Sequence, residues 1–180
     1  AEKVIQGLEQ GESIESLQSS LARINTESFE LHAEFEALAK KWLMAGKKVV
    51  TLGGDHSVSL GPIRALAERE TFSVLHIDAH ADLRVCYEGF EHSHASIMHH
   101  VKNLAGVEAL VQVGIRDLAP DEFAEIERNP KIKTHFDWDL RRASARGVSW
   151  AEQCKTIVDG LGENVYLSLD VDGLDPKYCP

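Results

Sequence analysis

The sequence is short of cysteine. Its 180 residues include three, at Cys86, Cys154 and Cys179. So small, odd and widely spaced a set implies no disulfide framework, and no pair has the spacing of zinc ligands. The default expectation is therefore a reducing, cytoplasmic setting.

Long apolar runs are missing as well. No stretch approaches the length that spans a bilayer, and the first residues, Ala-Glu-Lys-Val, lack a signal-peptide pattern. We therefore expect no membrane partner. The chain does not begin with an initiator methionine, so a processed or trimmed N-terminus is left open.

Basic residues are outnumbered by acidic ones. The 19 Lys and Arg are set against 29 Asp and Glu, and the formal net charge is −10 with His neutral. Nucleic-acid phosphates favour basic surfaces, so we expect no nucleic-acid partner. A solvated acidic surface explains most of the excess, and it also suits a site for divalent cations or a cationic substrate.

The residues that are present alternate between helical and extended patterns. We expect helices within residues 1–47, after Pro62, and at 94–104, 120–128 and 150–161. We expect strands at 49–52, 72–77, 110–115, 132–136 and 165–169. Such alternation predicts right-handed βαβ units in an α/β, three-layer domain with a mostly parallel sheet flanked by helices.

The last expected strand lies close to residue 180. A complete α/β domain usually covers such a strand with a following helix. Our interpretation is that residues 1–180 form a single domain that is incomplete at its C-terminus, with an incomplete N-terminus left open.

Three of the expected strands run directly into acidic and histidine residues. The segments are 52–57 (Leu-Gly-Gly-Asp-His-Ser), 77–82 (Ile-Asp-Ala-His-Ala-Asp) and 169–176 (Leu-Asp-Val-Asp-Gly-Leu-Asp-Pro). Ligands of parallel sheets bind at the carboxyl ends of the strands, so the three clusters should meet at one edge.

Spacing within these clusters predicts a cation site. Alternate residues of an extended segment point the same way, so each acidic run can face one site. Carboxylates with a few imidazoles favour harder ions such as manganese over thiolate-bound zinc. Six ligands suit two ions about 3.5 Å apart that share a water. The expected ligands are His56, Asp78, His80, Asp82, Asp170 and Asp172.

A structural interpretation stands beside each of these residues. One Asp after a strand is more often an N-cap or turn residue, and we assign Asp55 and Asp175 that role. Several like charges at one strand end would repel each other unless cations neutralised them. His76, inside a strand, is expected in the core or behind the ligands. His92 and His94 lie in a loop, and either could shuttle protons.

The three motifs together resemble the signatures of the arginase/agmatinase (ureohydrolase) family. Residues 53–57, 78–82 and 168–176 match in order and spacing, and the resemblance runs from about residue 48 to the end. It implies an arginase-like fold, two manganese ions and a homo-oligomer, trimer or hexamer. It also implies attack of a bridging hydroxide on a small cationic guanidino substrate, which releases urea and an amine.

The resemblance also assigns roles. His56, Asp78, Asp82 and Asp170 would bind one or both ions, and His80 and Asp172 would complete the set. Asp82 would also hydrogen-bond the attacking water. His94, rather than His92, resembles the loop histidine that protonates the leaving amine.

The residues at the expected substrate positions favour agmatinase over the other members of the family. Arginases carry a second Asp where this chain has Ala119, and their Ser-Gly-Asn-x-His pattern is absent. Formiminoglutamase stays open because of the Asp-Leu-Arg run at 82–84, and arginase activity stays open too. The family's guanidinium-binding glutamate lies downstream of the third motif, so a metal-binding non-catalytic homologue or fragment is a further alternative. The six-ligand set argues against a one-zinc deacetylase-like enzyme.

Overall fold

A computed structural model describes residues 1–175 and 177–179. Pro176, the last residue of the third motif, and Pro180 lie outside the described residues. The helices are α1 (Glu2–Glu9), α2 (Gln18–Met44), α3 (Leu60–Ala67), α4 (Ile97–Val101), α5 (Pro120–Arg128), α6 (Asp137–Ala145) and α7 (Trp150–Val158). The strands are β1 (Phe72–Ile77), β2 (Val107–Ile115), β3 (Ile132–Phe136) and β4 (Val165–Leu169).

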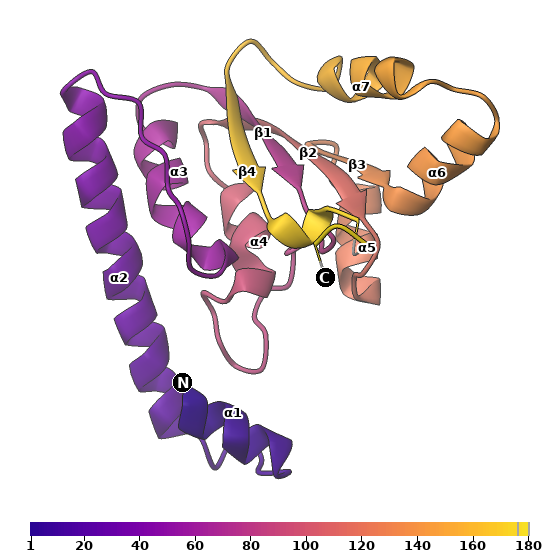
Figure 1. The fold of residues 1–180 in the computed structure, drawn as a ribbon. Coiled ribbons are helices and arrows are strands. Elements are labelled where there is room, and N and C mark those ends of the chain that lie inside the picture. The colour runs from indigo at the N-terminus through magenta and orange to yellow at the C-terminus, as the bar shows by residue number, and fades with distance from the viewer. Residues whose placement is uncertain (176, 180) are drawn as a thin grey trace.

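The four strands form one parallel sheet in the order β3-β2-β1-β4 (Figure 1). The chain steps outward from β1 to β2 and β3, and then returns to pair β4 with the other side of β1. The strand order thus reverses at β1. Ligands of open α/β sheets bind in the crevice at the carboxyl ends where this reversal occurs, which here means the ends of β1 and β4.

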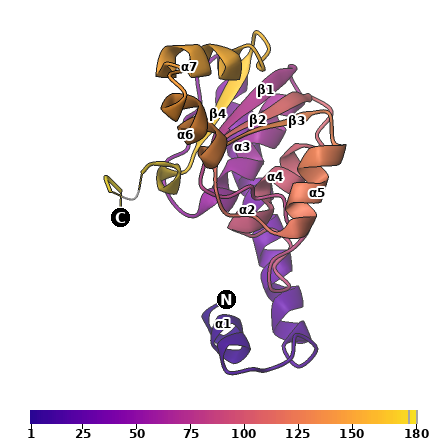
Figure 2. The same cartoon turned by 90° about the vertical axis from the view of Figure 1, so that its right-hand side faces the viewer.

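Helices cover both faces of the sheet (Figure 2). Phe72 and Val74 of β1 are buried on one face among residues of α3, α4 and α5. On the opposite face, Val111 and Val113 of β2 pack with Ile157 of α7 and with part of α6. This alternation of buried side chains along the strands confirms the expected three-layer α/β fold.

Most of the expected elements are confirmed. The strands at 72–77, 132–136 and 165–169 and the helix at 120–128 have the expected bounds, and β2 begins three residues earlier than expected. The helix expected at 94–104 is shorter, because a 3₁₀ turn at His94–Ser96 precedes the five residues of α4. Helix α6 was not anticipated.

The strand expected at 49–52 is wrong. These residues have no regular secondary structure, and the side chains of Val50 and Leu52 are 88% and 97% exposed. A cavity of about 820 Å³ separates residues 47–51 from β4. A strand needs a hydrogen-bonded neighbour, and the described residues supply none beside this segment.

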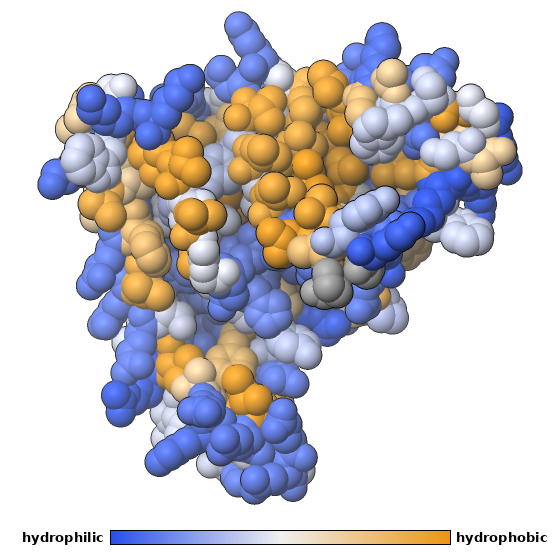
Figure 3. Space-filling view, in the orientation of Figure 1, coloured by the Kyte–Doolittle hydropathy of each residue, from blue (hydrophilic) through white to orange (hydrophobic). Residues whose placement is uncertain are grey.

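Strand β4 is consequently an edge strand with an uncovered apolar face. Val165, Leu167 and Leu169 are 44–56% exposed, and apolar side chains gather over this part of the molecule (Figure 3).

No helix of the described residues is long and apolar enough to cross a membrane.

Candidate metal centre

The first motif forms a tight turn that brings His56 to the sheet edge. Gly53 and Gly54 have φ values of 96° and 71°, a conformation that glycine adopts most readily. The Asp55 carboxylate then accepts a hydrogen bond of 2.9 Å from the backbone N of Ser57, and the His56–Ser59 3₁₀ turn leads into α3. Asp55 is therefore an N-cap residue, as expected, and His56 is buried behind it.

The second motif leaves β1 and turns back within five residues. Asp78 is 1% exposed, and its Oδ1 accepts a hydrogen bond of 2.7 Å from the backbone N of His80. The expectation of one unbroken extended segment is wrong at Asp82, whose φ is 54°. Asp adopts this left-handed conformation more readily than most residues. The turn still directs the Asp82 carboxylate into the same cavity as Asp78.

The third motif is likewise bent rather than extended. Asp170 caps the Val171–Gly173 3₁₀ turn, and its Oδ1 accepts a hydrogen bond of 3.1 Å from the backbone N of Asp172. A Cβ on Gly173 would lie 2.8 Å from the backbone N of Asp78. Only glycine therefore allows the second and third motifs to approach so closely.

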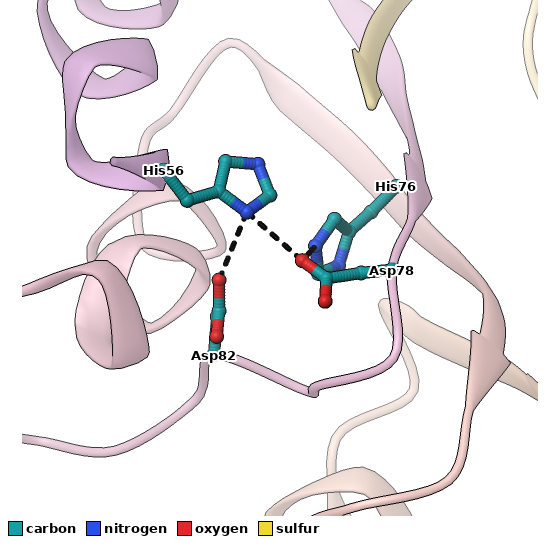
Figure 4. Close-up of side chains that lie close together, drawn as sticks. All are labelled: His56, His76, Asp78 and Asp82. Atoms are coloured by element: carbon teal, nitrogen blue, oxygen red, sulfur yellow. Dashed lines mark hydrogen bonds and ion pairs between the residues drawn. The ribbon is translucent and has the colours of Figure 1, made fainter. Parts of the chain in front are cut away.

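His56 is the centre of a buried cluster of carboxylates (Figure 4). Its Nδ1 lies 2.9 Å from Oδ2 of Asp78 and 3.0 Å from Oδ2 of Asp82. Oδ2 of Asp170 lies 3.5 Å from the same nitrogen. One ring N–H can satisfy only one of these three oxygens, so the arrangement suits a shared cation better than hydrogen bonds alone.

His80 is the centre of a second cluster, closer to solvent. Its Nδ1 lies 3.0 Å from Oδ2 of Asp172 and 3.5 Å from Oδ1 of Asp78. The side chains of His80 and Asp172 are 49% and 46% exposed. Asp78 belongs to both clusters, with one oxygen turned toward each. All six residues predicted to bind metal thus line a single cavity of about 330 Å³.

His76 lies behind Asp78 and is fully buried. The Gln112 side-chain nitrogen donates to the backbone O of Ala81 (2.7 Å), and it also lies 3.0 Å from Nδ1 of His76. His76 Nδ1 must therefore accept, and its Nε2–H donates to Oδ2 of Asp78 over 2.7 Å. This geometry places His76 as the residue that orients Asp78. Sequence reasoning missed Gln112, whose signal was a polar residue inside an apolar strand.

Burial and hydrogen bonding set the charges in the first cluster. Burial lowers the pKa of His56, but hydrogen bonds with Asp78 and Asp82 outweigh it and raise the pKa to about 10. For Asp78, burial acts to raise the pKa, but the bonds from His56 and His76 hold it well below its usual range. Burial dominates at Asp82, so the pKa of that carboxyl is raised. A nearby cation would therefore favour the charged form of Asp82.

The loop histidines occupy different places. His94 is exposed and lines the cavity, whereas His92 does not line it. His92 lies 5.4 Å from the ring of His32 and stacks on His100 at 4.7 Å. Sequence reasoning missed six other residues of the cavity wall, although Asp117 lies two residues after the end of β2 at the same sheet edge. These residues are Arg84, Tyr87, Ala95, Asp117, Leu118 and Glu122.

The donor set fits hard divalent cations. Two groups of side chains have ligand atoms within 4.8 Å of one another: His56, His76, Asp78 and Asp82, and Asp78, His80 and Asp172. Both ring nitrogens of His76 are already engaged, which leaves carboxylates and two imidazoles as ligands. None of the described residues that line the cavity is a cysteine, which disfavours softer thiolate-bound metals.

Comparison with known proteins gives the family. The sequence model of the Arginase family matches residues 10–180. This chain belongs to the arginase family. It is 39% identical over 152 residues to the N(1)-aminopropylagmatine ureohydrolase of Thermus thermophilus, which covers 84% of this chain and 48% of that protein. It is 33% identical over 147 residues to an agmatinase of Bacillus anthracis, covering 81% and 47%.

Solved structures of arginase-family proteins share the fold. The agmatine ureohydrolase of Thermoplasma volcanium superposes with a TM-score of 0.67 at 28% identity, over 84% of this chain and 48% of that one. This arginase-family chain thus spans about half the length of the curated relatives that it matches.

Proposed function

We propose that this chain carries the metal-binding part of a manganese-dependent ureohydrolase. The reaction would cleave a C–N bond of a linear guanidine and release urea, with agmatine as the preferred substrate. The observation that carries this proposal is the pair of donor clusters that share Asp78 at the carboxyl ends of β1 and β4. Two adjoining sites with a common carboxylate match the binuclear arrangement used in metal-assisted hydrolysis.

Each cluster would hold one ion. The first ion would be held by His56, Asp78, Asp82 and Asp170, and the second by His80 and Asp172 with the shared carboxylates. Two manganese ions bound there would lower the pKa of a shared water and so supply hydroxide at neutral pH. His56 must then be neutral, so metal binding at this site would displace a proton from the imidazole.

The chain's own residues would orient the water and move protons. Asp82 would accept a hydrogen bond from the attacking water and direct it toward the guanidino carbon. As the C–N bond of the tetrahedral intermediate breaks, His94 would give a proton to the departing amine nitrogen. His94 is suited to this because it lies in the cavity wall and outside both donor clusters.

Several features support a cationic substrate without an amino-acid end. Two further carboxylates, Asp117 and Glu122, line the cavity beside the four assigned to the metal ions, and their charge favours a guanidinium. Position 119 holds Ala, so no carboxylate there receives a substrate α-amino group. The relatives described above are named as an agmatinase and an N(1)-aminopropylagmatine ureohydrolase. Arginine and formiminoglutamate remain the competing substrates. The trimer or hexamer and the cytoplasmic location stay predictions.

Metal analysis followed by a urea-release screen tests this function. We expect about two manganese per chain, and urea from agmatine in preference to arginine or guanidinobutyrate. One zinc per chain would favour the deacetylase-like alternative. A full complement of manganese with no urea from any guanidine, in this chain or in a longer parent protein, would leave a non-catalytic metal-binding homologue.

His94 and His92 provide a matched pair of variants for the proton donor. We expect His94→Ala to lower the rate about 10²-fold or more, as loss of a general acid does, while the metal content stays the same. His92→Ala should change the rate much less, because His92 does not line the cavity. Loss of metal from His94→Ala would make that residue a ligand and contradict the assigned role.

A further inference from the structure

The loop of residues 84–95 joins the second metal motif to His94 and is closed at both its base and its tip. At the base, the backbone N of Arg84 donates to the backbone O of Ala95 over 3.1 Å. At the tip, Tyr87 and Phe90 exchange backbone hydrogen bonds of 3.0 and 2.8 Å. Glu88 and Gly89 between them have φ values of 53° and 84°, which suits a type I′ turn.

Within this loop, Tyr87 contacts His94 directly. The edge of one ring meets the face of the other, with centroids 5.9 Å apart and planes at 68°. Both residues line the metal cavity. Among the described residues, no hydrogen-bond partner is found for the Tyr87 hydroxyl, so the contact depends on the ring itself.

Tyr87 is also contacted by Arg84. The guanidinium carbon of Arg84 lies 5.1 Å from the Tyr87 ring centroid, within range of a cation–π interaction. Arg84 Nε also lies 3.6 Å from Oε2 of Glu122. An aromatic ring that contacts both a planar cation and His94 has little freedom to rotate.

Glu122 is a rigid anchor for this stack. It is 4% exposed, and its two oxygens accept hydrogen bonds from the backbone N atoms of Leu83 (2.9 Å) and Ala119 (2.7 Å). It therefore links the second motif to the start of α5. A chain of contacts runs from this fixed carboxylate through Arg84 and Tyr87 to His94.

We propose that Tyr87, anchored through Arg84 and Glu122, is a positioning residue that holds the His94 ring in the orientation for proton transfer. This inference rests on the proposed function of His94. Tyr87 would act through His94 and not on the substrate. Its loss should therefore lower kcat while changing KM much less, because proton transfer depends on the orientation of the donor.

Three variants of the full chain test the role of the ring. We expect Tyr87→Ala to lower kcat about 10- to 100-fold, in line with the cost of small misplacements, with metal content unchanged. Tyr87→Phe keeps the ring and should restore most of the rate. Val85→Ala, at a 70% exposed position of the same loop, controls for a general loosening of the loop. A Tyr87→Ala enzyme with wild-type kcat would overturn the proposal.

A double-mutant cycle separates positioning from an independent effect. If Tyr87 acts through His94, then Tyr87→Ala should cause no further loss of kcat in a His94→Ala background. Losses that multiply would mean that Tyr87 acts on the substrate or on the fold, and the inference would be wrong.

NMR of the His94 ring tests the same contact without turnover. Tyr87→Ala should remove the ring-current shift of the His94 ring protons, and Tyr87→Phe should preserve it. Unmoved His94 signals in Tyr87→Ala would overturn the inference even in an inactive protein. An inactive wild-type enzyme with the expected shifts would instead count against the proposed function alone.

Discussion

At the scale of single residues, the order of the metal site depends on a chain of hydrogen bonds behind Asp78. Thr134 donates to Gln112 (3.0 Å), Gln112 donates to His76, and His76 donates to Asp78. Each step fixes the direction of the next because a backbone carbonyl, Ala81 O, can only accept. These hydrogen bonds therefore determine which nitrogen of His76 faces Asp78. They also determine the orientation of the Asp78 carboxylate, which the two clusters share.

Replacing Gln112 should weaken metal binding without touching a ligand. In Gln112→Met, His76 Nδ1 loses its donor and the tautomer is no longer fixed. We expect manganese affinity to fall about 10- to 100-fold, the usual cost of losing an outer partner of a ligand. Isothermal titration of the metal-stripped protein with manganese measures this. Thr134→Val, which removes only the outermost bond, should have a smaller effect, and equal affinity in all three proteins would contradict the tautomer argument.

A second residue-scale prediction concerns Glu125. Its carboxylate accepts hydrogen bonds from Asn129, Lys102 and Arg128, which lower its pKa to about 2 from 4.5. A folded-state pKa below the unfolded value stabilises the protein above pH 4.5, and this stabilisation is lost as the pH falls toward 2. Removing the charge of Glu125 matters because its partner Lys102 is only 8% exposed and would be left as a buried charge without this carboxylate.

Glu125→Gln should therefore be less stable than the wild type at pH 7 by about 1–3 kcal/mol. The difference in unfolding free energy should shrink as the pH is lowered from 4.5 toward 2. Urea denaturation of both proteins across that range measures it. Glu127→Gln, at an exposed position of the same helix, is the matched control. A difference that does not depend on pH would show that the carboxylate charge is not the cause.

At the scale of elements, α2 does more than cover α3. Its side chain Asn25 donates to the backbone O of Gly89 (3.0 Å) and accepts from the backbone N of Glu91 (3.1 Å). Leu21, one turn earlier, packs so closely that a Cβ on Gly89 would lie 2.8 Å from it. Figure 1 shows the loop before α4 reaching toward this part of α2. The helix thus holds the tip of the loop that carries Tyr87 and His94.

Removing the Asn25 hydrogen bonds to the loop should loosen the loop and leave the metals in place. We expect Asn25→Leu to speed amide exchange in residues 84–95 and to lower kcat several-fold, with metal content unchanged. Hydrogen exchange with mass spectrometry and steady-state kinetics measure the two effects. Thr26→Ala is the control, since among the described residues that hydroxyl bonds to Ala22 O of its own helix alone. Unchanged amide exchange in Asn25→Leu would show that the Asn25 hydrogen bonds do not order the loop.

The element scale also shows where sequence patterns were sufficient. The apolar runs of β1, β3 and β4 all pair with a neighbouring strand of the sheet, and their bounds were predicted correctly. Residues 49–52 have the same apolar character, yet form no strand. A hydrophobic pattern indicates which side chains prefer burial. A strand also needs a neighbouring strand with free backbone groups, and no local sequence signal specifies that neighbour.

At the scale of the whole molecule, the uncovered side of β4 is the main irregular feature. An exposed strand edge with apolar side chains is a template for pairing with another chain. Leu167 is 56% exposed and also lines the cavity between β4 and residues 47–51. Association through this region should therefore depend on protein concentration and on the apolar character of β4.

Leu167→Lys should reduce such association, because a charged side chain on an edge strand opposes pairing. Sedimentation velocity over a range of concentrations measures the change. Val148→Lys, at a 40% exposed position before α7, introduces the same charge elsewhere and controls for net charge. If both variants associate like the wild type, β4 is not the contacting surface.

The sequence by itself determined the α/β class, most of the strands and the set of six candidate ligands, because periodicity and strand-end motifs are local properties. It also identified the family, since three spaced motifs rarely coincide. Only the tertiary structure decided how those ligands divide into two clusters around Asp78. It also placed His94 apart from His92 and brought Gln112, Arg84, Tyr87 and Glu122 to the site. Those relations depend on strand order and on left-handed and 3₁₀ turns, which join residues far apart in the chain.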